Sequence, residues 1–134
     1  MNMIPARIID IATEQKLSYI TSDCAGDRFA CLVLETPETN DKLRVGADIA
    51  LIFKEAEVVI TKNVSGHLSL RNRMAGTVRA LLKGTVITKA TVSYRTHTVI
   101  SLISTAAAVE MRLNVGDEVT AWVKATDVAI RWKG

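Results

Sequence analysis

The sequence has few of the residues on which secreted, zinc-binding and membrane proteins depend. Two of its 134 residues are cysteines, Cys24 and Cys31, and their separation fits neither a C-x-x-C zinc pair nor a disulfide framework. No apolar run is long enough to span a membrane, and the first residues lack the charged-then-apolar pattern of a signal peptide. We therefore expect a cytoplasmic protein without a membrane partner, in which Cys31 is a buried apolar residue.

Aromatic residues and charge of one sign are also scarce. Phe, Trp and Tyr make up 4% of the chain, and the formal net charge is +3, with acidic and basic residues interspersed. Binding of single-stranded nucleic acid needs a basic groove with stacking aromatics, for which Tyr19, Phe29 and Tyr94 are too few and too scattered. His67 and His97 lie in polar turns without a nearby catalytic arrangement, so the sequence does not predict an enzyme. The mild positive charge is compatible with a small anionic ligand.

What the sequence does contain is an internal repeat. A shift of seventy positions aligns the two halves without a gap. The repeat predicts two copies of one small unit, at residues 1–64 and 65–134. Because each unit is near the lower size limit for a self-sufficient core, the two are expected to pack together. The shift pairs identical residues at several positions, including Leu43 with Leu113, Val45 with Val115, Gly46 with Gly116, Lys54 with Lys124 and Val58 with Val128.

Each half has the pattern of a small β domain. Thr36 followed by Pro37 predicts a short helix in the first half, and the alanine-rich run 104–112 predicts one in the second. Five strands with a helix between the third and the fourth are typical of a Greek-key barrel of the OB type. We expect a mainly all-β fold: two tandem five-stranded OB-like barrels, each with one short helix. Apolar runs predict the strands 6–12, 17–21, 28–34, 49–54 and 57–60, and then 77–81, 86–94, 98–103, 118–124 and 127–132.

Two motifs of the second half resemble those of a known family. Residues 69–76, S-L-R-N-R-M-A-G, are similar to the S-A-R-N-x-L-x-G opening of the Mop, or molbindin, family of molybdate-binding domains. Residues 115–128 resemble that family's closing motif, x-G-x-x-V-x-A-x-[IV]-K-[AS]-[ST]-x-V, and residues 51–58 resemble a variant of it. The resemblance covers essentially the whole chain as two tandem copies. It implies paired domains that bind molybdate or tungstate at subunit interfaces, with no cofactor and no protein ligand bonded directly to the metal.

The residues of these motifs also suit a tetrahedral dianion on chemical grounds. Such a ligand needs convergent N–H and O–H donors with one or two fixed positive charges, and the start of a helix supplies backbone donors. Donors without a facing carboxylate favour an anion that is fully deprotonated at neutral pH, such as molybdate or tungstate, over phosphate. The residue chemistry and the resemblance together give the candidate oxyanion-binding residues Ser69, Arg71, Ser104, Thr105, Ala107, Lys124, Ala125 and Thr126, with Asn72 and Lys54 in second rank.

The first half departs from this pattern. Glu35, Pro37 and Glu55 occupy the segments that correspond to the donors of the second half. Pro37 lacks a backbone N–H, and the two glutamates would place negative charge where an anion should bind. We therefore expect oxyanion at the second-half residues and a mainly structural role for Lys54.

The function that the resemblance implies is binding of molybdate or tungstate for storage, buffering or sensing. The alternative is the effector-binding fragment of a molybdate-responsive transcription regulator or of a transporter ATPase. The chain itself has no helix-turn-helix pattern and no G-x-x-x-x-G-K-[ST] motif. Because the opening and closing motifs are too dispersed to converge easily within one barrel, we expect a homo-oligomer with interfacial sites. Stand-alone paired Mop proteins favour a trimer, and regulators favour a dimer.

Overall fold

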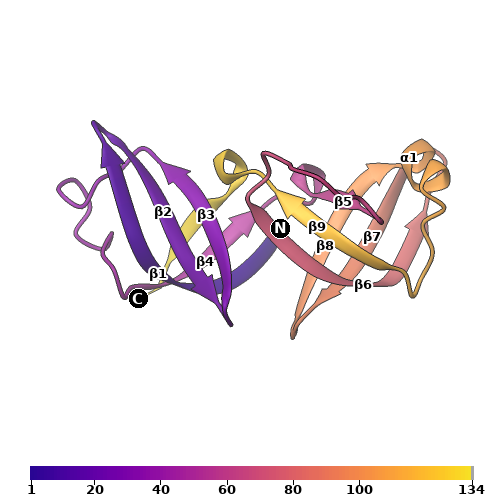
Figure 1. The fold of residues 1–134 in the computed structure, drawn as a ribbon, viewed down its shortest axis with the longest axis horizontal. Helices are drawn as coiled ribbons and strands as arrows, with labels where there is room; N and C mark the ends of the chain where they lie inside the picture. Colours follow the sequence, from indigo (N-terminus) through magenta and orange to yellow (C-terminus); the bar gives the residue numbers. More distant parts are fainter. Residues whose placement is uncertain (134) are drawn as a thin grey trace.

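Two five-stranded antiparallel sheets lie side by side in an elongated molecule (Figure 1), as seen in a computed structural model that describes residues 1–133. The mainly β fold class is confirmed, and each of the ten predicted strands has a counterpart. Within the described residues there is one α-helix, and no helix is long and apolar enough to cross a membrane. The elements, with η marking a 3-10 turn, are β1 (Asn2–Glu14), β2 (Leu17–Cys24), β3 (Asp27–Val33), β4 (Asp48–Phe53), η1 (Glu55–Glu57), β5 (Val59–Thr61), β6 (Asn72–Lys83), β7 (Ile87–Tyr94), β8 (His97–Ser104), α1 (Thr105–Glu110), β9 (Glu118–Val123), η2 (Ala125–Asp127) and β10 (Ala129–Trp132).

Strand β6 begins earlier than the sequence predicts and includes most of the opening motif. Asn72 and Met74 face the interior while Arg73 and Ala75 are exposed, which is the alternation of a strand with one buried face. Gly76 follows at a point of close contact: a Cβ atom there would lie 2.1 Å from the carbonyl oxygen of Ser93. The motif glycine is therefore required by the packing of β6 against β7.

The two halves exchange their last strands. β10 pairs with β4, with Ile130 opposite Leu51, and β5 pairs with β9, with Ile60 opposite Ala121. The strand orders are β10-β4-β1-β2-β3 and β5-β9-β6-β7-β8. The repeat predicts that the halves pack together, but it does not predict this exchange. Each sheet is built from both halves of the sequence, and one buried apolar cluster contains residues of both.

Two buried asparagines at equivalent positions of the repeat connect the sheets. The Asn72 side chain donates to the carbonyl oxygen of Ala30 at 2.9 Å and accepts from the Ala30 N–H at 2.6 Å. Asn2 makes the same pair of bonds with Ile100, both at 2.8 Å. Ala30 and Ile100 lie on β3 and β8, the edge strands of the two sheets. Each asparagine therefore satisfies backbone groups that the sheet edge leaves unpaired.

The predicted helix of the first half is not present. Residues 37–39 form a single turn, in which the N–H groups of Thr39 and Asn40 donate to the carbonyl oxygen of Thr36 at 3.0 and 2.9 Å. The side chains of Thr36 and Thr39 bond to the backbone of the same turn, and such local bonds compete with helix propagation. In the second half, Ala106 to Ala108 offer no such competition, and α1 forms.

The asparagine contacts give a stability prediction. Asn72→Ala leaves the N–H and the carbonyl oxygen of Ala30 buried without partners, so we expect the free energy of unfolding to fall by about 2–4 kcal/mol. Urea unfolding followed by circular dichroism measures the change. Lys16→Ala, in an exposed turn, is the control and should stay within about 0.5 kcal/mol of the unchanged protein. Equal unfolding midpoints for the two variants would contradict the role given to Asn72.

Candidate functional site

Arg71 and Lys124 flank one end of the β6–β9 ladder. Asn72 pairs with Val123 in this ladder, so the next residues outward, Arg71 and Lys124, lie at the same end of the two strands. The residues are far apart in the sequence and adjacent in the fold. The opening and closing motifs therefore converge within one chain, contrary to the expectation that they are too dispersed to do so.

The residues after Lys124 continue the group towards the other sheet. Ala125 is buried at the start of η2, and Thr126 is exposed. Thr126 lies beside Leu34 and Glu35, which follow β3, in a cavity that these residues share. Of the predicted oxyanion-binding residues, Arg71, Lys124, Ala125 and Thr126 thus form one group, with Ser69 two positions before Arg71 in the connecting segment.

A second group of predicted residues begins α1, and its polar atoms have partners within the chain. Ser104 is the N-cap, and its hydroxyl accepts a hydrogen bond from the Ala107 N–H at 3.0 Å. The Thr105 hydroxyl bonds to the Thr88 hydroxyl and to the carbonyl oxygen of Gly84, both at 2.8 Å. These bonds hold the first turn of α1 against the β6–β7 turn.

Within one chain the two groups lie apart. Figure 1 shows α1 at the outer end of the second sheet, whereas η2, the yellow turn after β9, lies in the middle of the molecule. The chain therefore brings Arg71 together with Lys124, but it does not bring Ser104, Thr105 and Ala107 to them.

The second-rank residues have different surroundings. Both polar atoms of the Asn72 amide are bonded to Ala30, and the side chain is fully buried. Lys54 lines a cavity of about 280 Å³ with Glu57, Asp127 and Thr126. The neighbouring Glu55 carboxylate pairs with the Met1 amino group at 2.6 Å. Lys54 thus shares its cavity with two carboxylates and is followed in the sequence by a third, Glu55. At the equivalent position after Lys124 the residue is the uncharged Ala125.

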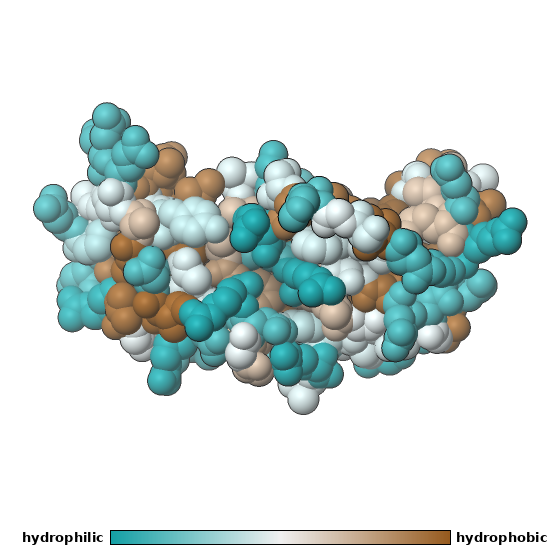
Figure 2. Space-filling model, in the orientation of Figure 1, coloured by the Kyte–Doolittle hydropathy of each residue, from teal (hydrophilic) through white to brown (hydrophobic). Residues whose placement is uncertain are grey.

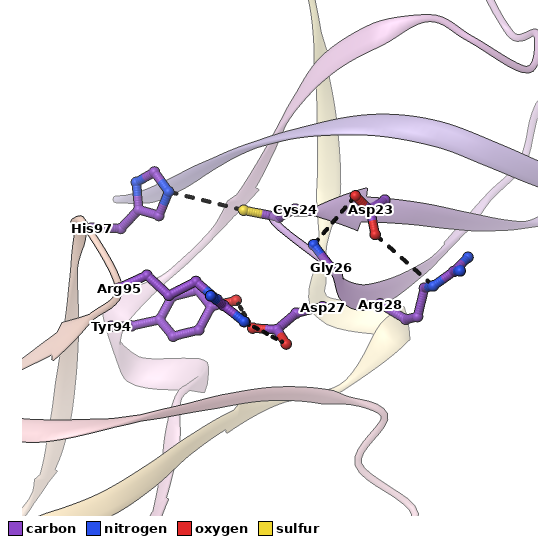
Figure 3. A network of polar contacts seen from close by, with 8 residues as sticks. All are labelled: Asp23, Cys24, Gly26, Asp27, Arg28, Tyr94, Arg95 and His97. Carbon is purple, nitrogen blue, oxygen red and sulfur yellow. Dashed lines mark hydrogen bonds and ion pairs between the residues drawn. The ribbon is translucent and has the colours of Figure 1, made fainter.

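A separate polar cluster joins the tips of two hairpins, β2–β3 and β7–β8 (Figure 3). The Arg95 guanidinium donates to both carboxylate oxygens of Asp27, at 2.8 and 3.1 Å, and the Tyr94 hydroxyl donates to the same carboxylate at 2.5 Å. The bonds from Arg95 and then Tyr94 lower the pKa of Asp27, while burial and Asp27 raise the pKa of Tyr94. His97 contacts the Cys24 sulfur at 3.9 Å. These partners could not be foreseen, since each pair spans the two halves of the sequence.

Neither cysteine is arranged for metal binding. Burial raises the pKa of Cys31 to about 12, and the side chain is 1% exposed, which confirms the prediction of a buried apolar residue. Within residues 1–133 no three His, Cys, Asp or Glu side chains are placed to hold a metal ion.

The structural role of Asn2 was not predicted from the sequence. Its position in the repeat, equivalent to that of Asn72, could have indicated this role.

Part of the chain matches the model of a known domain. Residues 68–130 match the model of the TOBE domain. This TOBE match contains β6 to β9, η2 and the two groups of predicted residues described above. No curated protein sequence matches the chain.

A solved structure resembles the whole chain. It is a crystal form of the cytoplasmic molybdate-binding protein ModG with molybdate bound, with a TM-score of 0.91 and 24% sequence identity. The match covers 98% of this chain and 96% of that chain. The likeness shows that the two proteins share their fold over nearly their full lengths.

The hairpin cluster predicts a pH-dependent contribution to stability. Because the folded state lowers the pKa of Asp27, its stabilisation is complete above the ordinary carboxyl pKa of about 3.9 and is lost as the pH falls through the lowered value. At pH 7 we expect Asp27→Asn to cost about 1 kcal/mol, since the pair is partly exposed. Urea unfolding at pH 7, 5 and 3 should show this difference shrinking at the lowest pH. Asp10→Asn, at an exposed position of β1, is the control; a difference that is the same at every pH would contradict the prediction.

Proposed function

We propose that this chain is a cytoplasmic protein that binds molybdate or tungstate, for storage, buffering or sensing. The observation that carries the proposal is the position of Arg71 and Lys124 at the same ladder end, with Ala125 and Thr126 directly after Lys124. The TOBE match of residues 68–130 and the fold shared with the molybdate-binding protein ModG support it.

The charges of this group are free for a ligand. Arg7, Lys62 and Arg95 are paired with carboxylates, whereas no ion pair within residues 1–133 involves Arg71 or Lys124. Two cations at one ladder end repel each other until an anion lies between them. A guanidinium adds paired N–H donors that fit an oxyanion, and the ammonium adds a point charge. Donors of this kind suit a fully deprotonated tetrahedral dianion.

The proposed architecture is a pair of tandem OB-like barrels. In this proposal each sheet is one barrel. Residues 1–64 contribute four strands of the first barrel and residues 65–134 contribute four strands of the second, and the fifth strand of each barrel comes from the other unit. The pairing of β5 with β9 and of β10 with β4 supports a pair that works as one body. The fold shared with ModG along nearly the whole chain supports the same arrangement.

We further propose that the oxyanion site is completed between subunits of a homo-oligomer. Ser104, Thr105 and Ala107 belong to the start of α1, which lies at the outer end of the molecule, so a second copy would have to bring them to Arg71 and Lys124. Apolar surface supports such contacts: towards both ends of the molecule, apolar residues interrupt the polar surface (Figure 2). Leu34 is 82% exposed and Val86 is 71% exposed. A trimer is favoured and a dimer is the alternative.

The alternative function is that of an effector-binding fragment of a molybdate-responsive regulator or of a transporter ATPase. The same site would then bind the same oxyanion, and the response would belong to segments beyond this chain. Neither alternative requires catalysis or a cofactor.

Calorimetric titration with molybdate tests the proposal. Arg71→Ala and Lys124→Ala each remove a charge-assisted contact, and we expect each to weaken binding by about 10- to 100-fold. Lys54→Ala is the matched control, since it removes the equivalent lysine of the first half, and we expect it to leave the affinity within about threefold of the unchanged protein. Loss of binding in Lys54→Ala with normal binding in Lys124→Ala would overturn the assignment.

Native mass spectrometry tests the interfacial arrangement. With molybdate present we expect a homo-oligomer, most simply a trimer, that carries bound oxyanion, because the two groups of site residues come from different copies. The subunit count and the number of bound ions are read from the same spectrum. A stable monomer that binds molybdate would contradict the interfacial site while leaving oxyanion binding itself in place.

A further inference from the structure

A cavity beside Arg71 is also lined by a second arginine, Arg28, from the other half of the chain. The cavity has a volume of about 220 Å³ and is lined by Tyr19, Thr21, Arg28, Phe29, Ala30 and Arg71. A buried water needs on the order of 15 Å³, so a small oxyanion with some of its hydration fits. Arg28 is not part of either motif that resembles the Mop family.

The strand register explains why these side chains face one cavity. In the β2–β3 ladder Thr21 pairs with Ala30, and Asp23 pairs with Arg28. Since alternate residues of a strand share a face, Tyr19, Thr21 and Arg28 lie on one face of the hairpin. This is the face opposite the buried Ile20 and Cys31. The hydroxyls of Tyr19 and Thr21 and the guanidinium of Arg28 are therefore presented together.

Arg71 is fixed against the same face by its neighbour. Asn72 is bonded twice to Ala30, which itself lines the cavity, and the backbone of Arg71 is held next to it. Because Asn72 is fully buried, its side chain is held in one position by these bonds and by the surrounding packing. Arg28 of β3 and Arg71, which immediately precedes β6, therefore line one small cavity.

The charges at this cavity are weakly compensated. Arg28 reaches the Asp23 carboxylate at 3.9 Å, the outer limit of an ion pair, and the Arg28 side chain is 67% exposed. None of the six lining residues carries a carboxylate. Two arginines in the lining of one cavity, with no acid among the lining residues, favour an anion as the occupant.

The equivalent face of the other sheet differs. The residue of β8 that corresponds to Arg28 is Thr98, whose hydroxyl accepts a hydrogen bond from Arg79 at 3.2 Å. The residue of β7 that corresponds to Tyr19 is Lys89. The bond from the Met1 amino group is the main cause that lowers the pKa of Glu55, and the charge of Lys89 adds to it. The arrangement of Arg28 with Arg71 is therefore not repeated at the equivalent face of the other sheet.

We propose that Arg28, with the hydroxyls of Tyr19 and Thr21, forms the second wall of the oxyanion site and faces Arg71. The oxyanion is then held by residues from both halves of one chain, and Arg28 determines affinity for a small tetrahedral dianion. This inference rests on the proposed oxyanion-binding function. It adds a residue that neither the motifs nor the repeat indicates.

The test is calorimetric titration of the full chain with sodium molybdate. Because Arg28 is exposed, its replacement should leave the fold intact, which circular dichroism and a thermal melt verify. We expect Arg28→Ala to weaken binding by about 10- to 100-fold. Arg28→Lys should give an intermediate loss, since it keeps the charge but not the paired N–H donors. Tyr19→Phe, which removes one hydroxyl, should give a loss of a few fold.

The matched control is Lys16→Ala, which removes one positive charge from the exposed turn before β2, outside the cavity. Binding by Arg28→Ala equal to that of Lys16→Ala overturns the inference. If Arg71→Ala still loses binding in that case, the proposed function stands without Arg28. If both arginine variants bind normally, the placement of the site beside Arg71 fails as well, whereas an unchanged chain that binds no molybdate would overturn the proposed function itself.

Discussion

The pairing of β10 with β4 and of β5 with β9 ties the two halves of the chain together through backbone hydrogen bonds. A sheet edge with unpaired N–H and carbonyl groups is costly and invites association with other chains. Here each half covers an edge of the other. The exchange also sets where the chain must cross between the sheets, and η1 and η2 lie at these two crossings. Lys54 and Lys124 immediately precede them, so the exchange places both lysines in the middle of the molecule.

The hydrogen bonds of the buried asparagines fix the position of Arg71. The carbonyl and amide of Asn72 satisfy one residue of the β3 edge, and the equivalent Asn2 satisfies one residue of β8. A buried amide with both of its groups bonded has one acceptable orientation, because any other leaves polar groups unpaired. The exposed arginine beside it is thereby held at the junction of the two sheets. Within one motif, Asn72 therefore has a structural role, and its neighbour Arg71 is left exposed for binding.

Most of the fold could be predicted from the sequence, because alternation of apolar residues reports which face of a strand is buried. The exchange could not, because residues 58–60 and 128–130 are equivalent in the repeat and either set could complete either sheet. The first-half helix was predicted from Thr36 and Pro37, but local side-chain bonds replaced it. For the site, the charges of Arg71 and Lys124 were visible in the motifs. The burial of Asn72 and the position of Arg28 were not, since both depend on contacts between the halves.

The strand exchange also has a consequence for how the protein is made. During synthesis the strands of the first sheet, β1 to β4, leave the ribosome while β10 does not yet exist. Until residues 129–132 have been added, β4 presents an open edge, and β5 has no β9 to join. Pairings across such long stretches of chain form slowly, and open strand edges in nascent chains favour association with other molecules. The first sheet can therefore be completed only when β10, the last strand of the chain, has been made, although its other four strands are synthesised first.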